Sequence, residues 1–276
     1  MIKLLKIEFK KILTYRIFWI LTGLYFIFLT LGLLMAEFMI NKQVDSINSR
    51  SPIPFPHITI YFFPWIWQNI TFFATIRYVL IFPAIVIIIL ITNEFTFKTI
   101  RQNVINGMSK AEFLSSKLLL ILIISLIMTV LLTVGTLILG MSYTSELTLA
   151  MITDKAAFMV GFFITMLTLQ IYALFFGFIF RNTGLAIALF TLYLFIAEPI
   201  LYYFLKSPIV FENNISPYLP LNAVLRLTEY PSIPLLKNLM GITLQDSVSW
   251  VACLIPSGYA AIMIGIVYWV LVKRDL

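Results

Sequence analysis

Residues 93–117 (NEFTFKTIRQNVINGMSKAEFLSSK) form a short polar segment between two long apolar runs. The cations of this segment outnumber its acids, with Lys98, Arg101, Lys110 and Lys117 against Glu94 and Glu112. From its residues alone, the segment can be a solvated cytoplasmic loop with ordinary helix caps. An excess of Lys and Arg in a short loop also marks the cytoplasmic side of a membrane protein.

The same segment carries signals for two helices. Four apolar residues recur at helical spacing and predict a first helix over residues 96–105. They are Phe97, Ile100, Val104 and Ile105. Gly107 is typical of a C-terminal stop, and Ser109 with Glu112 three residues later is typical of the N-cap of a second helix. We therefore predict two short helices that meet at a glycine and lie against the inner membrane surface.

The elements that position this segment are membrane spans. Hydrophobic residues make up 61% of the 276 residues and charged residues 11%, far below the charged share of about one quarter in soluble domains. Six apolar runs approach or exceed the ~20 residues that cross a bilayer core. They cover about residues 17–40, 70–92, 114–141, 155–180, 184–205 and 250–272. The expected fold is an all-α integral membrane protein with six transmembrane helices in a single domain over residues 1–276.

The distribution of charge predicts that both termini are cytoplasmic. With this orientation the inner side holds twelve of the nineteen Lys and Arg residues on the smaller share of loop residues, which follows the positive-inside rule. These cations are Lys3, Lys6, Lys10, Lys11, Arg16, Lys98, Arg101, Lys110, Lys117, Arg181, Lys273 and Arg274. Because the net charge of +7 follows the membrane sides, it is not a signal for nucleic acid.

Residues 1–16 are expected to form an amphipathic helix at the membrane interface. One face holds Met1, Ile2, Leu5, Phe9, Ile12 and Leu13, and the lysines lie opposite. A basic amphipathic helix of this kind binds by burying its apolar face and by attraction to anionic lipid. The alternative is a simple positive flank that fixes the orientation of the first span.

Two segments are expected outside the membrane in addition to a short turn at residues 143–154. Residues 41–69 contain four prolines that oppose a long helix, and the aromatic residues at 61–67 are typical of an interfacial belt. Residues 206–249 contain two short apolar helical patches, at 218–227 and 235–244.

Two charges lie within the predicted spans, Arg77 in the second and Glu198 in the fifth. Charges at this depth are usually paired or face water. Their similar predicted depth suggests an ion pair that lines the outer part of a translocation path, within one subunit or across a dimer. Alternatively, Arg77 extends to the interface or pairs with Glu37, and Pro199 only kinks the fifth span. The pair of small residues Ala261 and Gly265 is expected to serve internal helix packing.

The sequence offers little for catalysis or cofactor binding. No GxxxxGK[ST] motif occurs, so the chain cannot bind ATP through a P-loop. A single cysteine and a single histidine give no metal site, and no catalytic residue is predicted. A membrane enzyme would need several polar groups that converge, and an ion-coupled transporter commonly shows inverted repeats. Both classes remain alternatives, and neither has support from a pattern here.

The segment after the second span resembles the corresponding loop of ABC transporter permeases of the ABC-2 type, which have a type V exporter-like fold. The similar residues are Glu94-Phe95, Thr99, Arg101, Gly107-x-Ser109-Lys110, Phe113 and Lys117. Lys98 and Gly107-Met108 depart from the family pattern, which often has Gly and Pro there. The basic start that runs into Phe18-Trp19-Ile20 and the final Lys-Arg-Asp-Leu are also similar to this family.

The resemblance implies that residues 93–117 act as a coupling helix that docks into a separate ATPase subunit. The residues implied in coupling are Glu94, Lys98, Thr99, Ile100, Arg101, Ile105, Gly107, Met108, Ser109, Lys110 and Phe113. ATP and Mg would bind to the partner ATPase, and this chain itself would need no cofactor. Glu94 would favour the start of the coupling helix through its dipole, while Met108, Ile105 and Phe113 would fill apolar pockets of the ATPase.

The resemblance further implies a dimer of two permease subunits, identical or different, with an ATPase dimer in the inner membrane of a bacterial cell. The expected function is export of an amphipathic or lipid-like substrate, with membrane lipid and an accessory protein outside the membrane as further partners. In this family, short re-entrant helices between spans five and six would suit the two patches in residues 206–249. The sequence leaves the substrate open among drugs, peptides, lipids and glycans.

Overall fold

The computed structural model describes residues 2–50, 56–207, 215–228 and 247–273, and within these ranges the ordered elements are helices with no strand. Six helical segments are long and apolar enough to cross a membrane, as predicted. The first four contain α2 (Arg16–Asn48), α4 (Arg77–Thr96), α6 (Lys110–Tyr143) and α8 (Ala157–Phe180). The fifth joins α9 (Thr183–Leu192), the π-helix η1 (Tyr193–Ala197) and α10 (Glu198–Lys206), and the sixth is α13 (Trp250–Lys273).

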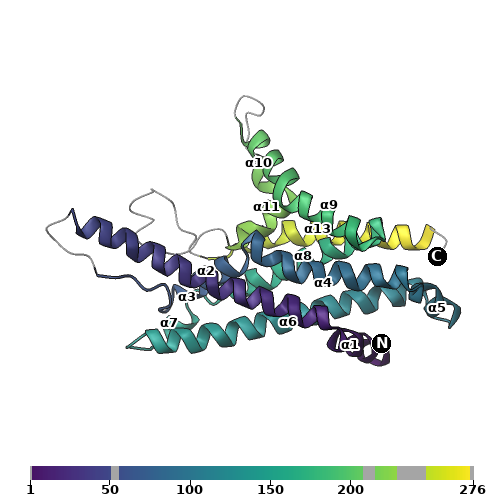
Figure 1. Cartoon of the computed structure of the whole chain (residues 1–276), viewed down its shortest axis with the longest axis horizontal. Helices are drawn as coiled ribbons and strands as arrows, with labels where there is room; N and C mark the ends of the chain where they lie inside the picture. The colour runs from purple at the N-terminus through teal and green to yellow at the C-terminus, as the bar shows by residue number, and fades with distance from the viewer. Residues whose placement is uncertain (1, 51–55, 208–214, 229–246, 274–276) are drawn as a thin grey trace.

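Shorter helices gather at the two ends of this bundle (Figure 1). At one end, α1 (Ile2–Thr14) and α5 (Thr99–Ile105) lie near the end of α13. Towards the other end lie α3 (Ile66–Ala74) and α7 (Leu149–Thr153). The turn η2 (Ser216–Tyr218), helix α11 (Pro220–Leu225) and the turn η3 (Arg226–Thr228) follow α10.

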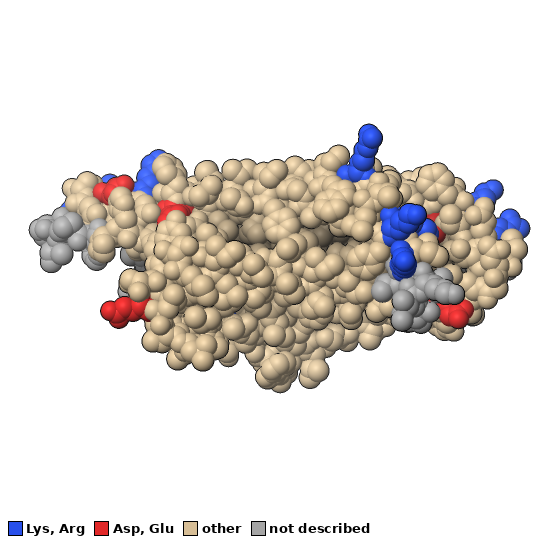
Figure 2. Space-filling model, turned by 90° about the horizontal axis from the view of Figure 1, so that it is seen from below, with Lys and Arg blue, Asp and Glu red and all other residues tan. Residues whose placement is uncertain are grey.

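Helices α4 and α8 form the centre of the bundle. In the most apolar 18-residue stretch of each span, 61% and 67% of the residues are buried in the spans that contain α4 and α8. In the other four spans only 17–28% are buried. The two helices approach closely at Gly177, where an added Cβ would lie 3.1 Å from Ile91. The other spans therefore keep wide apolar surfaces for lipid or for another subunit. On the face in Figure 2, the charged side chains gather towards the two ends and leave a broad uncharged middle.

The first two spans differ from the sequence prediction. Helix α2 continues eight residues beyond Ile40, because the polar residues that follow contain no helix breaker before Pro52. The predicted second span at 70–92 is divided, since α3 ends at Ala74 and α4 begins at Arg77. Neither Pro nor Gly occurs at the break, and Ile76 is extended with φ −60° and ψ 135°. A hydrogen bond of 2.6 Å between the hydroxyls of Thr75 and Thr228 holds the break against η3.

Other boundaries agree with the prediction more closely. The fourth and sixth spans begin and end within two residues of the predicted limits. Residues 181–183, between the predicted fourth and fifth spans, form a tight turn, with Arg181 left-handed at φ 54° and the Asn182 side chain accepting from the N–H of Leu185. The apolar patch at 218–227 is helical, whereas the patch at 235–244 lies outside the described residues.

The prediction that Ala261 and Gly265 serve packing inside the chain is wrong. Both residues are exposed on α13, and an added Cβ on Gly265 would meet no atom within 4 Å. This small-residue face is therefore open in the single chain.

Candidate functional site

The polar segment after α4 has the helix–glycine–helix layout that the sequence predicts, with two corrections. The four apolar residues expected on one face do not share it, because Phe97 precedes α5, and Ile100 is buried while Ile105 is exposed. Helix α4 ends at Thr96, and the left-handed Lys98 at φ 54° starts the seven-residue helix α5. Gly107 takes φ 93°, a conformation that suits glycine. The next helix is not short, because α6 runs from Lys110 through the whole third span.

Ser109 caps α6 through the predicted capping box. Its hydroxyl accepts from the N–H of Glu112 at 3.1 Å, while a Glu112 carboxylate oxygen accepts from the N–H of Ser109 at 2.9 Å. These bonds satisfy backbone donors that a helix start otherwise leaves open. They hold the start of α6 in place, directly after the turn that follows α5.

Helix α5 presents both apolar and cationic side chains to its surroundings. Phe97 and Ile105 are 67% and 75% exposed, and Lys98 and Arg101 are exposed beside them. Ile100 is buried in the core and anchors the helix from the other side. We call Phe97, Lys98, Arg101 and Ile105 the α5 surface.

Besides Ile100 and Glu94, which are buried, three more of the predicted coupling residues face inwards or bind to the chain itself. Phe113 is 1% exposed and packs edge-on against Phe178, so in this structure it does not reach an apolar pocket of a partner, as we expected. Met108 is half-buried against the core. The Lys110 ammonium donates to the carbonyl of Val272 at 3.1 Å, which ties the end of α13 to the start of α6.

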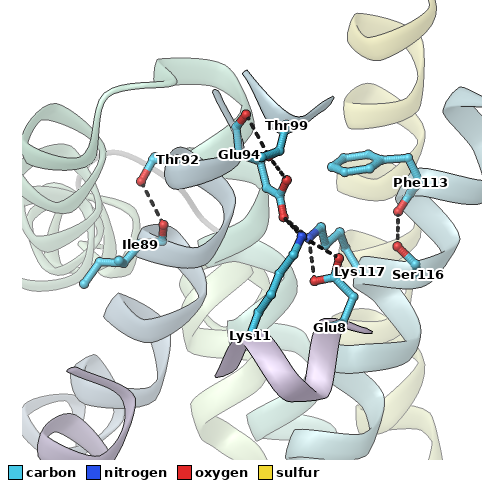
Figure 3. A network of polar contacts seen from close by, with 9 residues as sticks. All are labelled: Glu8, Lys11, Ile89, Thr92, Glu94, Thr99, Phe113, Ser116 and Lys117. Atoms are coloured by element: carbon cyan, nitrogen blue, oxygen red, sulfur yellow. Dashed lines mark hydrogen bonds and ion pairs between the residues drawn. The ribbon is translucent and has the colours of Figure 1, made fainter. Parts of the chain in front are cut away.

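A buried ionic cluster lies directly behind the α5 surface and contains Glu8, Lys11, Glu94 and Lys117 (Figure 3). Lys117 is 2% exposed, and its Nζ lies 2.6 Å from Glu8 Oε2 and 2.5 Å from Glu94 Oε1. Lys11 Nζ approaches the same two residues at 3.4 Å from Glu8 Oε1 and 3.1 Å from Glu94 Oε1. Two cations and two carboxylates thus neutralise each other.

The cluster joins four helices that the sequence separates widely. Glu8 and Lys11 belong to α1, Glu94 to α4 and Lys117 to α6, while the hydroxyl of Thr99 at the start of α5 donates to Glu94 Oε2. Glu94 therefore supports the start of α5 through a side chain. Burial alone lowers the pKa of Lys11, but the charges of Glu94 and Glu8 outweigh it, so the net pKa is raised and Lys11 stays charged.

Sequence reasoning missed this cluster, although a signal existed. Glu8 is the sole acid among the lysines of residues 1–16, and it falls beside the apolar face of the helix. A buried acid in that position needs a cationic partner. Lys117, which we counted only among the cations of the polar segment and the residues of the resemblance, is that cation, and Lys11 on the same helix adds to it.

Within the described chain, Arg77 and Glu198 do not form the predicted ion pair. Glu198 is 1% exposed, and its carboxylate accepts from the N–H groups of Leu221 and Asn222 at 3.0 and 2.6 Å and from Asn222 Nδ2 at 2.9 Å. It therefore holds the start of α11. Arg77 Nη1 instead donates to the carbonyl of Leu194 at 3.2 Å.

The π-helix explains why Leu194 offers its carbonyl. In η1 the N–H of Glu198 binds the carbonyl of Tyr193, five residues back. The next bond of this kind would run from residue 199 to Leu194, but Pro199 has no N–H. The carbonyl of Leu194 is left open in the buried interior, and Arg77 from α4 supplies the missing donor. The arginine, the proline and the π-helix thus act as one structural unit.

Comparison with known proteins places the chain in a family. The model of the ABC-2 family transporter proteins matches residues 2–276, and the comparison with curated proteins gives no match. Members of this membrane family are transport subunits that typically work with ABC ATPase partners. With six helices long and apolar enough to cross a membrane, the chain is a multi-pass membrane protein and belongs to the ABC-2 family of membrane permease subunits.

Proposed function

We propose that the chain is driven by a separate ABC ATPase subunit, which docks on the α5 surface. The observation that carries this proposal is the combination of exposed Phe97 and Lys98, just before α5, with exposed Arg101 and Ile105 on α5 itself. Apolar anchors ringed by charge are typical of protein interfaces. A cleft of about 280 Å³ adjoins this surface between α1, α4 and α5, and it has room for side chains of the partner.

The ionic cluster is the route by which docking moves the spans. Thr99 of α5 binds Glu94, and Glu94 binds both Lys117 at the base of α6 and Lys11 on α1. A displacement of α5 is therefore passed to α4 and α6 through short charged contacts rather than through a loose loop. Interfaces and packed cores of this kind switch between discrete arrangements.

The remaining assignments complete the proposal. The end with α1 and α5 faces the cytoplasm because it collects most of the cations, and α1 lies in the interface of the inner membrane of a bacterial cell.

Two permease subunits pair, with the exposed faces of α10 and α13 available for the contact. The substrate is amphipathic or lipid-like and moves outwards, and α11 is a re-entrant helix held by Glu198. ATP and Mg bind to the ATPase alone.

Docking is tested by the double variant Arg101→Glu, Ile105→Asp of the full chain, produced together with its ATPase subunit. Loss of a central apolar anchor costs about 2 kcal/mol or more, which is about 30-fold in affinity. We expect the wild-type chain to co-purify with the ATPase, and the double variant to lose it. The measurement is the molar ratio of ATPase to permease after affinity purification.

Lys42→Glu serves as the matched control, because it reverses one exposed charge near the far end of α2. It should leave the ratio unchanged. The proposal is wrong if the double variant retains the ATPase in full, or if the wild-type chain binds none.

A further inference from the structure

An apolar groove lies between α1, α2, α4 and α6. Its volume is about 200 Å³, and an apolar cavity of about 150 Å³ already holds a benzene molecule. The floor of the groove is buried, whereas its rim is about half exposed. The floor includes Ile12, Tyr25, Pro83, Val86 and Met128, and the rim includes Leu13, Trp19, Ile127 and Leu131. The groove is therefore open to the surroundings of the bundle.

The lining of the groove suits a hydrocarbon occupant. Trp19 Nε1 donates to the carbonyl of Leu13 at 2.9 Å, and the Tyr25 hydroxyl donates to the carbonyl of Ala74 at 3.3 Å. Apart from Thr22, the other lining residues have no nitrogen or oxygen in their side chains. A piece of α-helix ~10 Å wide and ~14 Å long occupies on the order of 1,000 Å³. The groove is thus too narrow for a helix of a partner and has the size for a single hydrocarbon chain.

The groove extends from one membrane boundary to the middle of the membrane. On α2, Tyr25 lies nine residues after Arg16, which is about 14 Å at ~1.5 Å per residue. On α4, Pro83 lies eleven residues before Glu94 of the ionic cluster, which is about 16 Å. Both lengths are close to half of a hydrocarbon core ~30 Å thick. This is the depth of an acyl chain of a lipid in one leaflet.

Exposed cations lie where the groove meets this boundary. Lys6 and Lys10 of α1 are exposed, and they share a helix face with the rim residue Leu13 because the spacings are four and three residues. Arg16 is exposed at the start of α2, three residues before Trp19 on the rim. The side of α1 and α2 next to the groove is therefore basic.

The carboxylates described at this end of the bundle are engaged elsewhere. Glu8 and Glu94 are buried and pair with Lys11 and Lys117 in the ionic cluster, and Glu112 caps α6. Within the described chain, none of these ion pairs uses a cation beside the groove. Basic residues at a membrane surface attract anionic lipid, so the charge at the boundary complements an anionic headgroup above the apolar groove.

We propose that this groove binds one acyl chain of an anionic phospholipid, with the headgroup held by Lys10 and Arg16 at the membrane boundary. The bound chain packs α1 against α2 and α6, which adjoin it at this end of the bundle (Figure 1). Because α1 also carries Glu8 and Lys11, the lipid stabilises the helix arrangement that the ionic cluster joins. This inference rests on the proposed function only for the assignment of the groove to the cytoplasmic leaflet.

The test measures lipid binding to the purified full chain in detergent by native mass spectrometry, without any ATPase. The anionic phosphatidylglycerol and the zwitterionic phosphatidylcholine are compared with the same acyl chains, and glycerophosphoglycerol serves as the headgroup alone. We expect phosphatidylglycerol to bind about tenfold or more tightly than phosphatidylcholine, because basic residues attract the anionic headgroup. The headgroup alone should not bind, because burial of the chain supplies most of the affinity.

The headgroup contact is tested by the double variant Lys10→Gln, Arg16→Gln. It should weaken the binding of phosphatidylglycerol by about tenfold or more and leave that of phosphatidylcholine unchanged. Both residues are exposed, so their replacement has little effect on folding. The matched control Lys42→Gln, Arg50→Gln removes one exposed lysine and one exposed arginine at the far end of α2. The control should bind both lipids like the wild type.

The chain contact is tested by Thr22→Phe, which fills the groove from α2 and should weaken the binding of both lipids by about tenfold or more. Ile20→Phe places the same ring at an exposed position of α2 outside the lining, and it should bind like the wild type. Binding of phosphatidylglycerol that is equal in the wild type, the double variant and Thr22→Phe would overturn the proposal, as would equal affinity for the two lipids or binding of the headgroup alone.

Occupation of the groove by a second copy of the chain would also overturn the proposal. In that case the chain would be a dimer in detergent, and Thr22→Phe but not Ile20→Phe would dissociate it. Because no ATPase is present, all these outcomes are independent of docking on the α5 surface.

Discussion

Replacement of Lys117 by methionine is expected to destabilise the chain by about 3–5 kcal/mol, which is typical when one partner of a buried ion pair is removed. Lys117 is 2% exposed and lies between Glu8 and Glu94 at 2.6 and 2.5 Å. Methionine fills the space but leaves two buried carboxylates with only Lys11 to balance them. The measurement is the free energy of unfolding in detergent micelles, together with ATP-driven transport by the assembled complex.

Lys11→Met is the matched control within the same cluster. Its side chain is 41% exposed, and its contacts with the carboxylates are longer, at 3.1 and 3.4 Å. Solvent screens such a pair, so we expect a loss of about 1 kcal/mol or less. Removing all the buried charge, with Glu8→Gln and Glu94→Gln added to Lys117→Met, should recover most of the stability. Equal stability of Lys117→Met and the wild type would contradict the role of the cluster.

The second large effect is expected at Arg77. Arg77→Gln removes the donor to Leu194 and leaves a buried carbonyl unpaired, which costs about 1–3 kcal/mol. If Pro199 is the cause of the open carbonyl, Pro199→Ala restores a backbone N–H and removes the need for the arginine. Arg77→Gln should therefore be much less destabilising in the Pro199→Ala background. A double-mutant cycle on the free energy of unfolding measures this coupling.

Lys206→Gln in both backgrounds provides the control, because it removes a cation at the opposite end of α10 from Pro199. It should give no coupling with Pro199→Ala. A cost of Arg77→Gln that is equal in the two backgrounds would show that the arginine and the proline act independently.

The sequence was sufficient for features that depend on local patterns. The six apolar runs predicted the six helices that can span a membrane, and Ser109 with Glu112 predicted the capping box. Gly107 marked the turn between α5 and α6 through its need for a positive φ. Each of these features is determined by residues within one or two helical turns of each other, so periodicity and capping rules apply directly.

Features that depend on distant contacts could not be predicted in the same way. The break before Arg77 has no Gly or Pro and is held by Thr228, which lies 153 residues away. Glu198 and Arg77 were expected to pair because their predicted depths in the membrane were similar, but they bind backbone groups of α11 and η1 instead. The sequence of a uniformly apolar span gives no signal for the backbone N–H or C=O groups that lack a partner within the helix. Glu8 was overlooked because its buried partner, Lys117, comes from α6, more than a hundred residues away.

The central claim is that a nucleotide-hydrolysing subunit docks on the α5 surface, and photo-cross-linking from position 105 tests it most directly. A photoreactive amino acid replaces Ile105, which is 75% exposed, and the same residue at Lys42 serves as the control. In membranes of cells that produce both proteins, we predict a covalent adduct between the chain and its ATPase from position 105 and none from position 42. An adduct from position 42 alone, or no adduct from position 105, would contradict the claim.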